Sequence, residues 1–78
     1  MRLPQITRDP SGSRLGGAGL DITCAIEWYE FLADEAYFND DVVMHDRFKA
    51  RADRLKGSPK GYLYSHELES FIAQYRKD

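Results

Sequence analysis

The fold is decided by residues 21–37, which read DITCAIEWYEFLADEAY. Apolar side chains recur in this stretch at spacings of three and four residues, which is the pattern of one face of an α-helix. Asp21 precedes the pattern and is a good N-cap, because its carboxylate can accept the free amide protons of the first turn. The stretch predicts a helix over residues 22–37, with a core stripe made of Ile22, Ala25, Ile26, Tyr29, Leu32, Ala33, Ala36 and Tyr37.

Two further helices follow along the chain. The acidic break at residues 39–41 supplies a second N-cap, and Gly57 supplies a C-cap, so we expect a helix over residues 41–56. Ser65 is placed to cap a third helix over residues 66–76. The core stripes of these two helices are Met44, Phe48, Ala52 and Leu55, and Leu68, Phe71, Ile72 and Tyr75.

The chain is long enough for one small core. It has 78 residues, of which 42% are hydrophobic and 31% are charged, as in a globular protein. Residues 1–20 contain four glycines and two prolines, so we expect them to form an extended N-terminal arm, either a flexible tail or a segment that packs across the helices or orders on a partner. The expected fold is all-α, with a three-helix domain over residues 21–78 behind this arm.

Charge is strongly segregated along the sequence. Residues 15–46, the acidic block, carry eight acidic side chains and no lysine or arginine. Residues 47–78 carry eight basic and four acidic side chains, and the whole chain has a net charge of −2. Like charges held close together repel one another, so the acidic block needs an opposing basic surface. That surface is either the C-terminal half of the same chain or a basic partner.

The first expected helix has a second apolar face, formed by Cys24, Trp28 and Phe31 and continued by Phe38. A helix with two apolar faces is either covered on both sides or offers one side to another molecule. The arm or the third helix is one candidate cover. The alternative is a binding patch in which aromatic anchors are surrounded by acids.

These features favour a non-enzymatic interaction protein that docks on a larger protein or complex with a basic surface, such as a nucleic-acid-handling machine, and blocks it sterically and electrostatically. A homodimer through the same aromatic face is an alternative arrangement. By type, as a small acidic protein without a catalytic motif, the chain resembles inhibitors that mobile elements make against host systems, including anti-CRISPR proteins. The expected partner-binding residues are Glu27, Trp28, Phe31, Asp34, Glu35, Phe38, Asp40 and Asp41.

Nucleic-acid binding is the alternative function. Arg47, Arg51 and Arg54 form a one-sided basic stripe on the second expected helix, and the arm adds three arginines. The acidic block opposes this function, because its charges would repel phosphates. The same arginines are also natural partners for the acids of the first helix.

Residues 48–72 resemble an EF-hand helix–loop–helix that has lost its calcium. Gly61 matches the mid-loop glycine, Leu63 matches the apolar residue that pairs with a neighbouring hand, and Glu67 matches the terminal glutamate that grips the metal. Two of the loop's ligand positions hold Lys56 and Lys60 instead of acids. The resemblance therefore implies a loop that does not bind calcium. A plain helix–turn–helix corner is the alternative interpretation.

No set of residues in the sequence suggests catalysis or a cofactor. Cys24 is the only cysteine, and His45 and His66 are the only histidines, with no spacing that links them in a metal site. No stretch is apolar for long enough to span a membrane. We expect a cytoplasmic protein that is not an enzyme, holds no metal and needs no cofactor.

Overall fold

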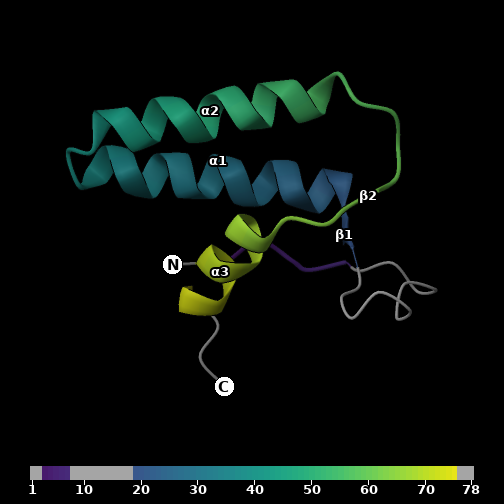
Figure 1. Cartoon of the computed structure of the whole chain (residues 1–78). Coiled ribbons are helices and arrows are strands. Elements are labelled where there is room, and N and C mark those ends of the chain that lie inside the picture. Colours follow the sequence, from purple (N-terminus) through teal and green to yellow (C-terminus); the bar gives the residue numbers. More distant parts are fainter. Residues whose placement is uncertain (1–2, 8–18, 76–78) are drawn as a thin grey trace.

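The computed structural model describes residues 3–7 and 19–75. This part of the chain is mostly helical, with three helices and one very small sheet, so the all-α expectation is confirmed (Figure 1). Each helix begins and ends within one residue of its expected position, and Arg76 lies outside the described residues. The elements in chain order are β1 (Leu20–Asp21), α1 (Ile22–Phe38), α2 (Val42–Lys56), β2 (Tyr62–Leu63) and α3 (His66–Tyr75).

The three expected N-caps are all present. The Asp21 carboxylate accepts a hydrogen bond from the Thr23 amide at 2.8 Å, and the Asp41 carboxylate accepts one from the Met44 amide at 3.2 Å. The Ser65 hydroxyl accepts one from the Leu68 amide at 3.3 Å. Each cap satisfies an amide that the first helical turn leaves without an intrahelical partner, so the helix starts are determined locally.

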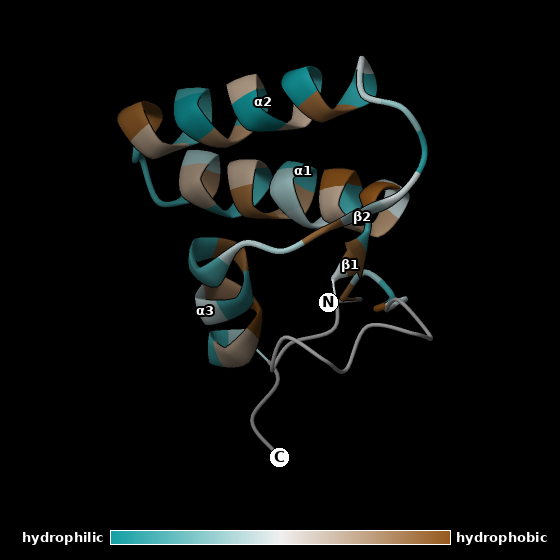
Figure 2. Cartoon of the chain, turned by 45° about the vertical axis from the view of Figure 1, so that its right-hand side comes forward, coloured by the Kyte–Doolittle hydropathy of each residue, from teal (hydrophilic) through white to brown (hydrophobic). Residues whose placement is uncertain are grey.

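The helices α1 and α2 form an antiparallel hairpin, and α3 lies across it at a steep angle (Figures 1 and 2). The connection between α1 and α2 is short because Asp40 adopts the left-handed backbone conformation, with φ 60°. The Asp41 amide then donates a hydrogen bond back to the Ala36 carbonyl at 2.8 Å, which closes the turn. The turn therefore projects as the free end of the hairpin.

A two-stranded antiparallel sheet ties the start of α1 to the segment before α3. Leu20 pairs with Leu63, and Asp21 pairs with Tyr62. The strands pass so closely that a Cβ atom on Gly19 would lie 3.0 Å from the Cβ of Tyr62, and glycine removes this conflict. These strands were not expected from the sequence, because two residues are too few to show a periodic pattern. The EF-hand resemblance implies a paired apolar residue at Leu63, and the residue that pairs with it is Leu20.

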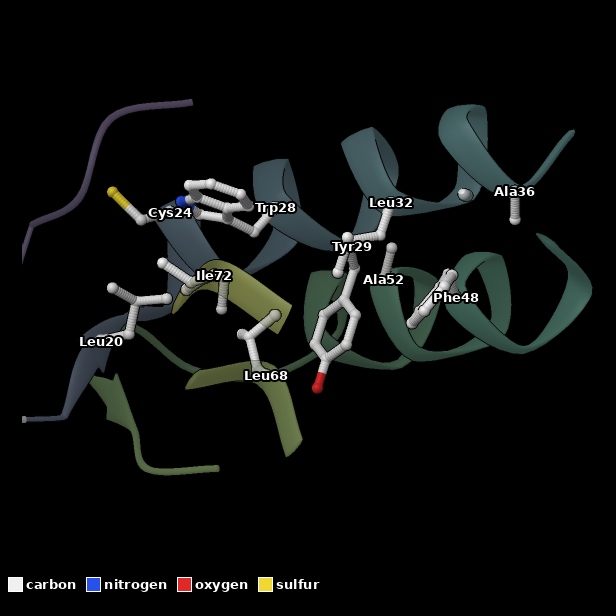
Figure 3. Packing of buried hydrophobic residues seen from close by; sticks show 12 residues of the cluster. Leu20, Cys24, Trp28, Tyr29, Leu32, Ala36, Phe48, Ala52, Leu68 and Ile72 are labelled. Carbon is white, nitrogen blue, oxygen red and sulfur yellow. The ribbon is translucent and has the colours of Figure 1, made fainter. Parts of the chain in front are cut away.

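The core lies between the hairpin, α3 and the sheet (Figure 3). Leu3 and Ile6 are half-buried against it, and the Thr7 carbonyl accepts a hydrogen bond from the Asp21 amide at 2.7 Å. Residues 3–7 of the expected arm therefore pack on the domain, and residues 8–18 lie outside the described part. The buried residues are Leu20, Cys24, Ala25, Trp28, Tyr29, Leu32, Ala33, Ala36, Phe48, Ala52, Leu68 and Ile72.

Candidate protein-binding surface

The second apolar face of α1 is mostly core. Trp28 has 0% of its surface exposed and Cys24 is also buried, whereas Phe31 is half-buried. The Phe31 ring packs edge-on against the rings of Trp28 and of Tyr75 in α3, with ring centroids 5.6 Å and 5.2 Å apart. Figure 3 shows Ile72 of α3 beside Trp28. Of the two alternatives, the binding patch is therefore wrong at Trp28, because α3 packs on it and residues 3–7 pack against the same core. Glu27 lies at the edge of this cover, beside Leu3.

Four of the six exposed large hydrophobic side chains in the described residues lie instead at the free end of the α1–α2 hairpin, and the other two are Tyr62 and Tyr64. Phe38, which the sequence analysis did assign to the binding surface, is 80% exposed. Its ring packs against the Tyr37 ring, with the two ring centroids 6.5 Å apart. The prediction that Tyr37 belongs to the core stripe is wrong, because Ala36 is the last buried residue of α1 and Tyr37 is exposed. We call this surface the apolar tip; its members are Tyr37 at 63% exposure, Phe38, Val42 at 58% and Val43 at 64%.

Val42 and Val43 are the members of the apolar tip that the sequence analysis missed. They begin α2 next to each other, and neither belongs to the core stripe that starts at Met44. Two adjacent β-branched residues at the first turn of a helix, outside its apolar stripe, were the available signal. Large apolar side chains exposed together on a small domain are typical of an interaction surface.

His45 connects the two helices of the hairpin next to the apolar tip. Its Nδ1 lies 2.9 Å from the carbonyl oxygen of Ala33, so this nitrogen must carry the proton and donate. Its ring lies 5.4 Å from the Tyr37 ring. His45 therefore joins α2 to α1 just below the exposed side chains, and this contact gives the histidine a structural role.

Acids surround the apolar tip. Asp40 and Asp41 lie in the turn itself, and both are exposed. Asp34 lies one helical turn before Phe38, and Asp46 lies one turn after Val42, so each is a neighbour of the tip on its own helix. Glu35 is half-buried on α1 and faces a groove described below. The tip thus has the composition of an interface centre with a polar rim.

Little of the acidic block is neutralised within the described part of the chain. Within the described residues, one ion pair joins this block to a basic side chain. It connects Glu30 and Lys56, with a nitrogen–oxygen distance of 2.9 Å. Hydrogen bonding and charge attraction from Glu30 raise the pKa of Lys56. Glu30 lies in the middle of α1, away from the turn. Internal complementarity therefore acts along the hairpin and does not reach the acids of the tip.

The basic stripe of α2 is partly occupied by the chain's own groups. Arg51 forms an ion pair with Glu67. Partial burial lowers the pKa of Arg51, but the hydrogen bond to Tyr29 and the attraction of Glu67 outweigh it and raise the pKa overall. Arg47 and Arg54 are exposed, and Arg54 lines a shallow hollow of about 360 Å³ with Tyr29 and Arg51. The stripe therefore does not present three unpaired guanidinium groups to a phosphate backbone.

The segment that resembles an EF-hand, residues 48–72, contains an ion pair. The Glu67 carboxylate, which matches the position of the terminal glutamate in the EF-hand pattern, pairs with Arg51. Within residues 3–7 and 19–75, no three side chains among His, Cys, Asp and Glu are grouped so that they could hold a metal ion.

None of the helices in the described ranges has both the length and the apolar character needed to cross a membrane. Comparison of the chain with models of known protein families, with curated proteins and with solved structures found no match. The surface therefore has to be interpreted from its own geometry and charge.

Proposed function

We propose that this protein is a non-enzymatic interaction module that docks its apolar tip, with the acids around it, on a basic surface of a larger protein. The observation that carries the proposal is the coincidence of exposed Phe38 and Val43 with acids that no described base neutralises. Burial of the apolar side chains would supply affinity, at roughly 25 cal/mol per Å² of apolar area removed from water. The acids would supply orientation and a fast encounter with a basic partner.

The same surface supports an inhibitor or adaptor role. Proteins that handle nucleic acids have basic grooves that bind phosphates, and an acidic protein seated there would exclude the nucleic acid both sterically and electrostatically. A partner of this class fits the resemblance in type to anti-CRISPR proteins. Direct binding of nucleic acid by the α2 arginines is less favoured, because Arg51 is paired with Glu67.

Capture of partners from a lysate of the source organism tests the proposal through matched variants. The tip variant combines Phe38→Ser and Val43→Ser, which remove exposed side chains without opening the core. The control combines Tyr62→Ser and Tyr64→Ser, which remove two exposed aromatic side chains from β2 and the residue that follows it. We expect a captured protein to be retained by the wild type and the control and lost by the tip variant. Equal capture by all three would refute a role for the tip.

The electrostatic part is tested on the purified complex. Asp34→Lys with Asp46→Lys reverses two exposed charges on either side of the tip, whereas Asp53→Lys reverses an exposed charge elsewhere on α2. We expect the first change to weaken binding at least tenfold and to reduce its dependence on salt, and the second to have little effect. Binding that is unaffected by both changes and by salt would show that charge has no role in the interaction.

A further inference from the structure

A groove lies next to the apolar tip, where the second half of α1, the first half of α2 and the end of α3 approach one another. It encloses about 290 Å³. This is at or below the lower limit of small-molecule pockets, which hold roughly 300–1,000 Å³. Its size suits one large side chain better than a cofactor. The apolar residues that line it are Leu32, Ala36, Met44, Phe48, Phe71 and Tyr75.

The walls of the groove combine a fixed part with an adaptable part. Phe48 and Phe71 hold each other in an edge-to-face contact at 5.2 Å, which joins α2 to α3. Met44 is half-buried one turn before Phe48 on α2, next to the tip residue Val43. The unbranched thioether of methionine can adjust to the shape of an incoming side chain. The groove is therefore preformed, with one flexible wall.

The polar lining of the groove selects for a basic ligand. It includes Glu35 and Asp41 together with the amides of Asn39 and Gln74, and none of its lining residues within ranges 3–7 and 19–75 is basic. The pKa of the Tyr75 phenol is raised, mainly by burial and to a smaller extent by the negative charge of Glu35. An apolar side chain could enter the groove while lysines or arginines on the same segment meet Glu35 and Asp41 at its edge.

We propose that this groove receives an apolar anchor side chain from a basic helix of the partner. The inference rests on the proposed function and extends it, because it defines the ligand class of the surface beside the tip. A helix fits better than an added strand, since the strands of the described chain are two residues long and lie at the other end of α1. The groove is lined by side chains, and a helix presents side chains while its backbone is satisfied internally.

A pair of synthetic probes tests the ligand class on the full chain. Both are helical peptides of 18 residues with leucine along one face; the other face is lysine in the first probe and glutamate in the second. Backbone amide shifts in NMR spectra would follow each titration. We expect the lysine probe to bind and to shift amides of α1, α2 and α3 around the groove, and the glutamate probe not to bind at comparable concentration.

Three substitutions distinguish binding at the groove from binding at the tip. Met44→Gln places a polar group in the groove at similar size, whereas Val43→Gln changes a tip residue that does not line it. Gln74→Phe fills the groove from an exposed position of α3 and leaves the core unchanged. We expect Met44→Gln and Gln74→Phe to weaken the lysine probe at least fivefold, and Val43→Gln to change it less than twofold. Circular dichroism would show that all three variants fold.

Each contrary outcome overturns the groove proposal. Binding that is weakened by Val43→Gln but not by Met44→Gln or Gln74→Phe would place the helix on the tip alone. Equal binding of both probes would contradict the selection for a basic helix, and failure of the lysine probe to bind would contradict the groove as a helix site. None of these results bears on partner capture by the tip variant, so failure of the groove and failure of the proposed function are distinguishable.

Discussion

The two ends of α1 differ in what covers them, although both carry large aromatic side chains. Near the start of the helix Trp28 is fully buried, whereas at its end Phe38 is 80% exposed. The first end packs against the sheet, residues 3–7 and α3, and the second end is joined to α2 by a tight turn and projects beyond them (Figures 1 and 3). The comparison shows that an apolar face in a sequence does not reveal which part of it will be covered.

The lengths of the elements explain this difference. At 1.5 Å per residue, a helix of 17 residues is about 25 Å long, whereas a helix that crosses it covers only its own width of about 10 Å. Because α3 lies at a steep angle to α1, it does not run along α1 to the turn, and only its second half reaches the groove beside the tip (Figure 2). The apolar tip at this end is the surface that we propose docks on another molecule.

The largest expected effect comes from truncating one aromatic residue at each end. Trp28→Ala removes a fully buried side chain and should lower the free energy of unfolding by about 3–5 kcal/mol. That approaches the total of roughly 3–5 kcal/mol that a core of this size supplies, so this variant should be largely unfolded. Phe38→Ala should change the same free energy by no more than about 0.5 kcal/mol. Urea titrations followed by circular dichroism would measure both.

A milder substitution serves as the control for Trp28. No group in the described ranges accepts a hydrogen bond from the buried indole nitrogen, so Trp28→Phe should lose packing volume and no hydrogen bond. We therefore expect Trp28→Phe to remain folded. A Phe38→Ala variant less stable than Trp28→Ala would reverse the comparison.

A second, smaller effect tests the cover contributed by residues 3–7. Ile6 is half-buried against the core, so Ile6→Ala should reduce the free energy of unfolding by about 1–2 kcal/mol. The matched change at the uncovered end, Val43→Ala, should have little effect because this side chain is largely exposed. Thermal melts of the two variants would show the difference, and identical melting temperatures would indicate that residues 3–7 do not cover α1 in solution.

A third prediction separates stability from binding at the turn. Asp41→Ala removes the N-cap of α2 and should cost about 1 kcal/mol of stability. Asp41→Asn keeps an oxygen acceptor for the Met44 amide but removes the charge, so the stability should be retained while affinity for a basic partner falls. Thermal melts and binding titrations of both variants are the measurements. If Asp41→Asn bound as tightly as the wild type, the charge of Asp41 would have no part in recognition.

The smallest expected effect concerns Tyr75, which lies between the two ends. Burial, and then the charge of Glu35, raise the pKa of this phenol above its ordinary value of 10.0. The fold thus favours the protonated phenol, so the contribution to stability is complete below pH 10 and is lost as the pH rises through the pKa of the folded state. Tyrosine side-chain NMR would follow the titration, and Glu35→Gln should lower the pKa of Tyr75. An unchanged pKa in that variant would show that Glu35 does not act on Tyr75.

The local elements could be predicted from the sequence because their causes lie within a few residues. The side chains of Asp21, Asp41 and Ser65 bond to amides two or three residues away, and the apolar spacing that defines each helix repeats within one or two turns. Phe38 and its neighbouring acids were assigned to the proposed surface from the same local spacing, and Phe38 is 80% exposed. The sequence by itself therefore determined the all-α class, the helix bounds and the segregation of charge.

The tertiary structure alone decided which apolar surface is hidden. Trp28 became core and Tyr37 became exposed because of where α3 and residues 3–7 lie, and the groove exists because Leu32, Met44 and Phe71 meet from three helices. The pairing of Leu20 with Leu63 joins segments more than 40 residues apart, and two-residue strands carry no pattern that predicts it. Such contacts depend on the geometry between elements, which local spacing does not encode.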